Sequence, residues 1–202
     1  NNAGSNAGSN ALLGLASIGG PAAFKLLGML SKKFRSACNS FIEDTLVSTE
    51  FGLKRIADIK IGDKVWAYNE ETSEKSLQEI VHLIHGEGDK EIVDITLMSG
   101  EVIQATSGHP FYVNDADGEW SWLNAGDLVT GSTLTDKNGD ELQVASVDKY
   151  LKQLSVFNLT VDKDHTYYVG ESGVLSHNAG ICPKNINPLS VIQFGHTFSR
   201  HG

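Results

Sequence analysis

The sequence predicts an all-β domain between residues 38 and 178, with a short helical segment before it. Three observations predict this class. From Cys38 onward the chain consists of short apolar runs rich in Val, Ile, Thr and aromatic residues. Turn-forming groups separate these runs, as expected for many short strands. Three blocks of sequence also recur in the same order, which indicates an internal duplication.

The composition fits one good-sized globular domain with tails. The chain has 202 residues, of which 40% are hydrophobic and 20% charged. Its net charge is −9, and its longest basic cluster is Lys32, Lys33 and Arg35. Nucleic acid is therefore not an expected partner of the main body. Two distant cysteines, Cys38 and Cys182, form neither a disulfide framework nor a CxxC metal site. We expect no metal and no other cofactor.

Residues 1–37 are expected to form a linker and an apolar helical segment. Residues 1–10 are a small polar repeat that is typical of a linker. Residues 11–30 are apolar, but Gly19-Gly20-Pro21 and Lys25 interrupt the run. This favours two short packed helices over a membrane span. The chain begins with Asn and shows no secretory signal pattern, so it looks like a piece of a longer protein whose localisation cannot be read.

Turn signals divide the predicted β domain into strands. They are Glu50-Phe51-Gly52, Ile61-Gly62-Asp63, Met98-Ser99-Gly100, Asn138-Gly139-Asp140 and Glu171-Ser172-Gly173. The pattern lasts until Asn178, and Pro183 and Pro188 then mark a linker. The expected domains are therefore residues 1–37, 38–178 and 179–202.

The duplication relates two β subdomains by a predicted pseudo-two-fold axis. The matching blocks are Asp58-Ile59-x-x-Gly62-x-x-Val65 with Asp127-Leu128-x-x-Gly131-x-x-Leu134, residues 92–97 with 156–161, and residues 109–113 with 165–169. The symmetry puts His109 and His165 in equivalent positions. We therefore expect these two histidines to converge on one site.

Several blocks resemble those of one superfamily. They are Cys38-Asn39-Ser40-Phe41 with Asp44-Thr45-Leu46-Val47, the stretch from Gly52 to Val65, Thr106-Ser107-Gly108-His109, residues 157–161 leading to His165, and Val174-Leu175-Ser176-His177-Asn178. Together and in this order they resemble the Hedgehog/intein (Hint) superfamily, in particular bacterial intein-like and pretoxin-Hint domains. The resemblance implies a horseshoe-like β fold that cleaves its own chain in a single turnover.

The resemblance implies that Cys38 begins the reaction. Its thiol would attack the carbonyl of Ala37 and form a thioester, which cleaves easily. An amide nitrogen leaves poorly unless it is protonated, and His109 would supply that proton. Thr106 would hydrogen-bond around the same carbonyl.

The resemblance also implies a second cut, after Asn178. The side-chain amide nitrogen of Asn178 would attack its own carbonyl, close a succinimide and break the bond to Ala179. His177 would polarise the carbonyl or protonate the leaving nitrogen, and His165 would assist proton transfer.

Two positions depart from the intein pattern. Many inteins carry Asp or Cys where this chain has Asn158, which cannot take a proton, so the first step is expected to be slow. Ala179 offers no nucleophile to accept an acyl group, and Cys182 is placed differently, so we expect cleavage and not splicing.

The segments on either side of the predicted domain suggest a biological role. Pretoxin-Hint domains lie between a delivery protein and a toxin, so residues 179–202 are expected to begin a toxin domain of a secreted or cell-surface bacterial protein. An immunity protein would then be a further partner. His82 and His85 are expected at the surface. The alternative function is a catalytically inactive Hint fold that connects delivery module and toxin.

Overall fold

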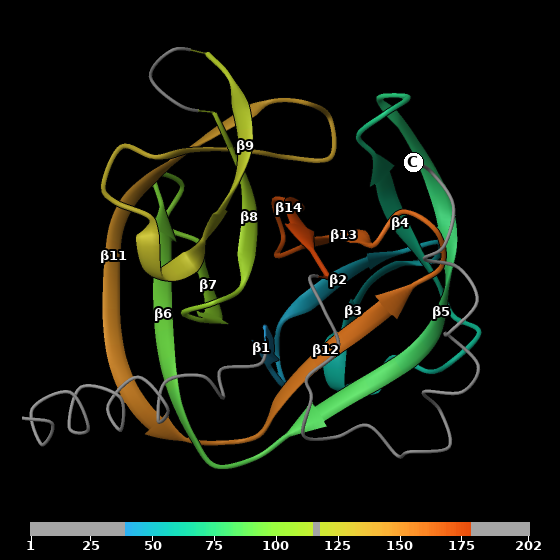
Figure 1. Cartoon of the computed structure of the whole chain (residues 1–202), viewed down its shortest axis with the longest axis horizontal. Coiled ribbons are helices and arrows are strands. Elements are labelled where there is room, and N and C mark those ends of the chain that lie inside the picture. The colour runs from blue at the N-terminus through green and yellow to red at the C-terminus, as the bar shows by residue number, and fades with distance from the viewer. Residues whose placement is uncertain (1–38, 115–117, 179–202) are drawn as a thin grey trace, which may run out of the picture. The chain divides into compact units, whose positions relative to one another are not determined.

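The computed structural model describes residues 39–114 and 118–178. These residues form 14 strands and two short 3-10 helices, so the predicted all-β class is confirmed (Figure 1). The first elements are β1 (Phe41–Ile42), β2 (Leu46–Thr49), β3 (Gly52–Arg55), η2 (Ile56–Asp58), β4 (Lys64–Asn69), β5 (Glu74–Gly86), β6 (Asp89–Leu97) and β7 (Val102–Thr106). The others are β8 (Pro110–Asn114), β9 (Trp120–Asn124), η3 (Ala125–Asp127), β10 (Thr133–Thr135), β11 (Glu141–Gln153), β12 (Val156–Val161), β13 (Thr166–Val169) and β14 (Val174–His177).

Three expectations concern residues beyond this description. The helical segment before residue 38, the first residues of a toxin after residue 178, and Cys38 itself all lie outside the described residues. In the part of the chain that the structure describes, no helix is long and apolar enough to cross a membrane.

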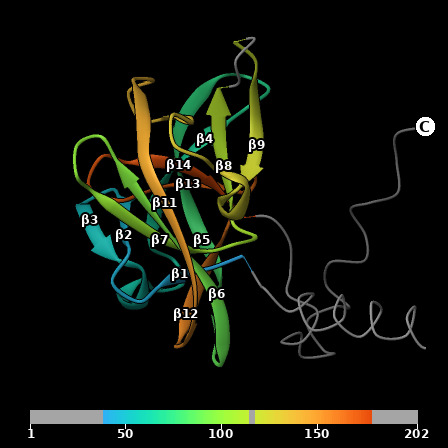
Figure 2. The ribbon, with the colours of Figure 1, turned by 90° about the vertical axis from the view of Figure 1, so that its left-hand side faces the viewer.

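All strand pairs are antiparallel and join into one continuous path. Its order is β10-β11-β6-β7-β1-β12-β5-β4-β2-β13-β14-β8-β9, with β3 on β2. A further pairing between β10 and β8 brings the path back on itself. In Figure 1 the long strands β6 and β11 lie side by side, and β5 lies beside β12. Figure 2 shows β11 and β6 from their outer side. Pairing in a ring satisfies the backbone groups of these strands.

The duplication predicted from the sequence is confirmed in the backbone. Each half begins with a 3-10 turn, and the residues that follow, Ile59 and Leu128, have φ, ψ of −68°, 145° and −64°, 149°. Gly62 and Gly131 then adopt φ of 91° and 88°, which favours glycine at both positions. Each half continues into a hairpin, β4–β5 in the first and β10–β11 in the second.

The two halves exchange strands. Strand β6 of the first half pairs with β11 of the second, and β12 of the second half pairs with β5 of the first. Each pair has a register shift, opposite Leu97 in the β6–β11 pair and at Val161 in the β5–β12 pair. Leu97 and Val161 are equivalent positions in the duplication. Neither half therefore has a complete sheet without the other.

An aromatic cluster occupies the core where strands of both halves meet. Phe41, Phe111 and Tyr167 are fully buried, and the Phe41 ring lies 6.0 Å from Phe111 and 6.1 Å from Tyr167 between centroids. Burial of one such phenylalanine stabilises a fold by about 1.5–3 kcal/mol. Because Phe41 belongs to β1, the cluster fixes the first residues of the described chain against β8 and β13.

Candidate functional site

The peptide between Asn39 and Ser40 enters the domain at the edge of β7. Ser40 is 1% exposed. Its N–H donates to the Thr106 hydroxyl (2.9 Å), and its carbonyl accepts from the Thr106 N–H (2.9 Å). The next residue, Phe41, pairs with Ala105 and with Phe157. This pairing on both sides holds the start of the described chain in one register.

Asn158, on β12, holds the other polar atom of this peptide. Its Nδ2 donates to the Asn39 carbonyl at 2.6 Å. Its Oδ1 accepts from the Leu159 N–H (2.8 Å) and the Tyr167 hydroxyl (2.6 Å). Burial raises the pKa of Tyr167 well above its usual range, so the hydroxyl keeps its proton and donates. Two donors on Oδ1 fix the amide orientation, with the NH₂ group towards Asn39.

His109 lies next to these groups and has no contact with solvent. Its backbone N–H donates to the Thr106 carbonyl (2.9 Å), and its ring centroid lies 4.0 Å from that of Phe41. Neither ring nitrogen has a hydrogen-bond partner among the described residues. Burial, and secondarily the charge of His177, lower the pKa of His109 to about 3. The ring is therefore neutral near pH 7, with one N–H donor and one acceptor nitrogen.

The last described residue, Asn178, reaches the same place from the other end. Strand β14 pairs with β8 so that Ser176 lies opposite Phe111. Continued by two residues, past the ends of both strands, this antiparallel register would direct Asn178 towards His109. The Asn178 N–H donates to the His165 carbonyl at 2.6 Å, and the residue is only 7% exposed. The two ends of the described chain are thus directed towards the same region, beside His109.

His177 forms the outer wall of this site. Its half-buried ring packs edge-on against Trp122 at 4.9 Å between centroids. Burial lowers the pKa of His177, Glu70 raises it and His165 lowers it further. The net shift is downward, so His177 is also neutral near pH 7.

His165 differs from the expected arrangement. The duplication makes it equivalent to His109, but its side chain is exposed and its backbone has a φ of 54°. It contributes its carbonyl, which fixes Asn178, and its charge acts on His177. Pro110 starts a strand directly after His109, whereas the positive φ at His165 turns that side chain outward.

The structure brings four predicted residues together, namely Thr106, His109, His177 and Asn178. Cys38, Ala37 and Ala179 lie outside the described residues. Asn158 and Tyr167 were not among the predicted site residues. Asn158 stands where many inteins carry Asp or Cys, and it was expected only to slow the first step because it cannot take a proton. The position of Asn158 inside a Hint motif block was the available signal.

The described residues contain no group of three or more His, Cys, Asp or Glu side chains that could hold a metal ion. His82 and His85 are exposed on β5, where this strand pairs with β12. His85 packs its ring on Phe157. These positions agree with the expectation that both histidines are at the surface.

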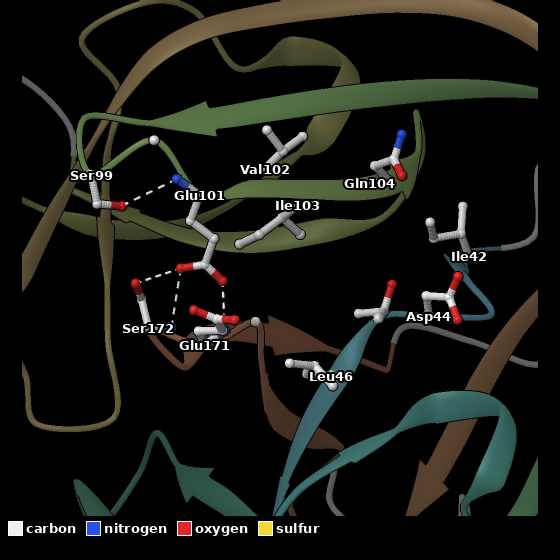
Figure 3. Close-up of a pocket in the computed structure, with 13 residues that line it drawn as sticks. Ile42, Asp44, Leu46, Ser99, Glu101, Val102, Ile103, Gln104, Glu171 and Ser172 are labelled. Carbon is white, nitrogen blue, oxygen red and sulfur yellow. Dashed lines mark hydrogen bonds between the residues drawn. The ribbon is translucent and has the colours of Figure 1, made fainter.

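The surface cleft in Figure 3 lies away from the candidate site, and the hydrogen bonds inside it stabilise the fold. Within it the Glu101 carboxylate accepts from the N–H groups of Glu171 and Ser172 and from the Ser172 hydroxyl. These bonds tie the start of β7 to the β13–β14 turn. None of the candidate site residues lines this cleft.

Comparisons with known proteins agree with this architecture. The pretoxin HINT domain model matches residues 46–179. The bacterial intein-like domain from Clostridium thermocellum is 38% identical over 69% of this chain and 98% of its own, with a TM-score of 0.63. The gp41-1 intein (23% identical, 69% of this chain, 98% of its own, TM-score 0.55) and a DnaB intein from Synechocystis sp. (22%, 71%, 99%, 0.57) share the fold. No curated protein matches. The chain belongs to the pretoxin HINT domain family of the Hint superfamily.

Proposed function

We propose that this intein-like domain cuts its own backbone at both ends, and that the cut after Asn178 releases the segment that follows. The observation that carries the proposal is the convergence of both ends on His109. The Ser40 backbone is bonded to Thr106, whose carbonyl accepts from the backbone N–H of His109, and the β14–β8 register, continued by two residues, directs Asn178 towards His109. A domain that only connects two modules has no need for its two ends to share one buried histidine.

The C-terminal cut would proceed by cyclisation of Asn178. Its side-chain nitrogen attacks its own carbonyl carbon, the bond to Ala179 breaks, and the Ala179 nitrogen takes a proton. The bond from the Asn178 N–H to the His165 carbonyl limits rotation of the residue, and its burial keeps out competing water. Neutral His177 carries one ring N–H that can protonate the leaving nitrogen.

The N-terminal cut would involve Thr106 and His109. The resemblance to inteins implies that a side chain near the start of the domain attacks the carbonyl just before it, and the sequence alone predicts Cys38 for this role. His109 would then protonate the leaving nitrogen with its ring N–H. The contacts of Thr106 favour a reaction at the start of β1, because its hydroxyl bonds to the chain there.

The product of the C-terminal cut suggests the biological role. Pretoxin domains are linked to a downstream toxin, so the released segment would begin the toxin at Ala179. Ala has no side-chain nucleophile, so the flanking segments would separate without being joined. The domain acts once on its own chain, and an immunity protein for the toxin would be a separate partner.

Variants of Asn178 test this proposal. Wild-type chain should release residues 179–202 with a free amino terminus at Ala179 and leave a product ending in a succinimide. Asn178→Ala should abolish this cut because it removes the attacking nitrogen. Asn178→Asp should slow it strongly, because a carboxylate lacks that nitrogen. Mass spectrometry of purified protein near neutral pH measures both products over time.

Asn138→Ala is the matched control. Asn138 precedes Gly139 in an exposed turn, where ordinary deamidation proceeds easily but leaves the backbone whole. This variant should cut after residue 178 at the wild-type rate. Cutting in Asn178→Ala at the same rate would assign the break to a contaminating protease and overturn the proposal.

A further inference from the structure

We propose that the N-terminal cut falls between Asn39 and Ser40, with the Ser40 hydroxyl as the nucleophile in place of the Cys38 thiol. The inference rests on the proposed self-cleavage and names the bond and the attacking group of its N-terminal step. It comes from the contacts of one peptide, which the site holds at both polar atoms.

The carbonyl of this peptide already has the partner that a reacting carbonyl needs. Asn158 Nδ2 donates to the Asn39 oxygen at 2.6 Å, a position suited to stabilising negative charge that develops there. Asn158 is 2% exposed, so little water competes for this bond. The Tyr167 hydroxyl and the Leu159 N–H hold the amide in its donating orientation.

The nitrogen of the same peptide is held as firmly. The Ser40 N–H donates to the Thr106 hydroxyl at 2.9 Å. The Thr106 carbonyl accepts from the backbone N–H of His109 at 2.9 Å, so a single turn joins the two residues. The His109 ring lies against Phe41, the residue directly after Ser40, and has no hydrogen-bond partner among the described residues. Its N–H and its acceptor nitrogen are both available to the reaction.

Cys38 can replace Ser40 in this position only if the chain slips by two residues. Such a slip preserves the face of a strand but puts Asn39 into the position of Phe41. Phe41 is fully buried in the aromatic cluster, whereas the slip would move it to the exposed position of Glu43. The register of β1 on β7 and β12 therefore selects Ser40.

The proposed cleavage consumes one water molecule and needs no other co-reactant. The Ser40 oxygen bonds to the Asn39 carbonyl carbon, and its proton passes to the acceptor nitrogen of His109. The bond from that carbon to the Ser40 nitrogen breaks, and the nitrogen takes a proton from the His109 ring. The product is an ester between Asn39 and Ser40. Water then splits the ester into a carboxylate at Asn39 and a chain that begins at Ser40.

Asn158 has the side chain that this step needs. An Asp at this position would present acceptor oxygens to the Asn39 carbonyl and could not donate when ionised. The amide supplies a donor instead. Asn158→Asp and Asn158→Ala should therefore slow the N-terminal cut by roughly 10²- to 10³-fold, the usual loss for one such donor. The cut after Asn178 should stay near its wild-type rate, which shows that these variants fold.

The decisive experiment compares four full-length chains: wild type, Cys38→Ala, Ser40→Ala and Ser40→Cys. Each is incubated with and without hydroxylamine, which attacks esters and thioesters, and the new amino terminus is identified by mass spectrometry. Wild type and Cys38→Ala should both yield a chain that begins at Ser40. Ser40→Ala should lose this cut and keep the cut after Asn178. Ser40→Cys should yield a chain beginning at residue 40 and respond to added thiol.

Two outcomes overturn the inference in distinguishable ways. A new amino terminus at Cys38 that survives Ser40→Ala and disappears in Cys38→Ala assigns the step to the thiol, while the proposed function stands. If wild type breaks at neither end, even with hydroxylamine, the proposed function and this inference both fail.

Discussion

His109 is fully buried, and this gives the domain a measurable sensitivity to acid. Its pKa falls from 6.5 to about 3 on folding, chiefly because burial disfavours the charged ring. Between these values the unfolded chain binds a proton that the folded chain does not. The free energy of unfolding therefore falls as the pH drops from 6.5 towards 3, by at most about 1.4 kcal/mol per pH unit from this residue.

The prediction is tested by denaturant unfolding at pH 7 and pH 5. His109→Gln cannot titrate, so its stability should change less between these pH values than that of the wild type. His82→Gln, on the exposed part of β5, is the matched control and should keep the wild-type dependence. An unchanged pH dependence in His109→Gln would show that this ring does not titrate as described.

At the scale of residues, the sequence predicted which side chains gather but not how each is used. Thr106, His109, His177 and Asn178 lie together, and their chemical roles stay predictions. The direction of the Asn158 amide depends on Tyr167, on another strand, which no local pattern reveals. The exposure of His165 depends on its φ of 54°, which the match to His109 does not contain.

At the scale of elements, the repeated turns give a direct test of the duplication. Gly62 and Gly131 have φ of 91° and 88°, and a Cβ at Gly131 would meet nothing within 4 Å. At Gly62 the nearest atom would be the flexible end of Glu79, at 4.0 Å. Backbone strain is therefore the main cost of a side chain at either position.

Gly62→Ala and Gly131→Ala should each lower the free energy of unfolding by about 1–2 kcal/mol, the usual cost of this backbone region. The two losses should be similar because the two turns are equivalent. Denaturant unfolding of each variant measures them. A neutral effect at one position beside a large loss at the other would contradict the equivalence.

The strands and their duplication could be predicted because alternation, turn residues and repeated blocks are local signals. The exchange of β6 and β12 between the halves could not. Each of these strands would satisfy its alternation equally well against the hairpin of its own half. The partner of each strand is set by pairing between residues far apart in sequence, β6 with β11 and β12 with β5.

At the scale of the whole domain, the ring of strands explains why cleavage depends on folding. Asn39 and Asn178 are far apart in sequence, and they are brought to the same side of the domain because β1 joins β7 to β12 while β14 joins β13 to β8. The sequence placed the N-terminal cut before Cys38, and that assignment stays a prediction. The register of β1 could not be predicted from the sequence, because it rests on the burial of Phe41 among side chains of distant strands.

The central claim is that the folded domain breaks its own chain after Asn178. The most direct test is the intact mass of the purified 202-residue chain during prolonged incubation near neutral pH. The account predicts progressive loss of residues 179–202, a succinimide on the remaining product, and no such loss after the domain has been unfolded in denaturant. A folded chain that keeps its full mass throughout would contradict the account and leave an inactive connector as its function.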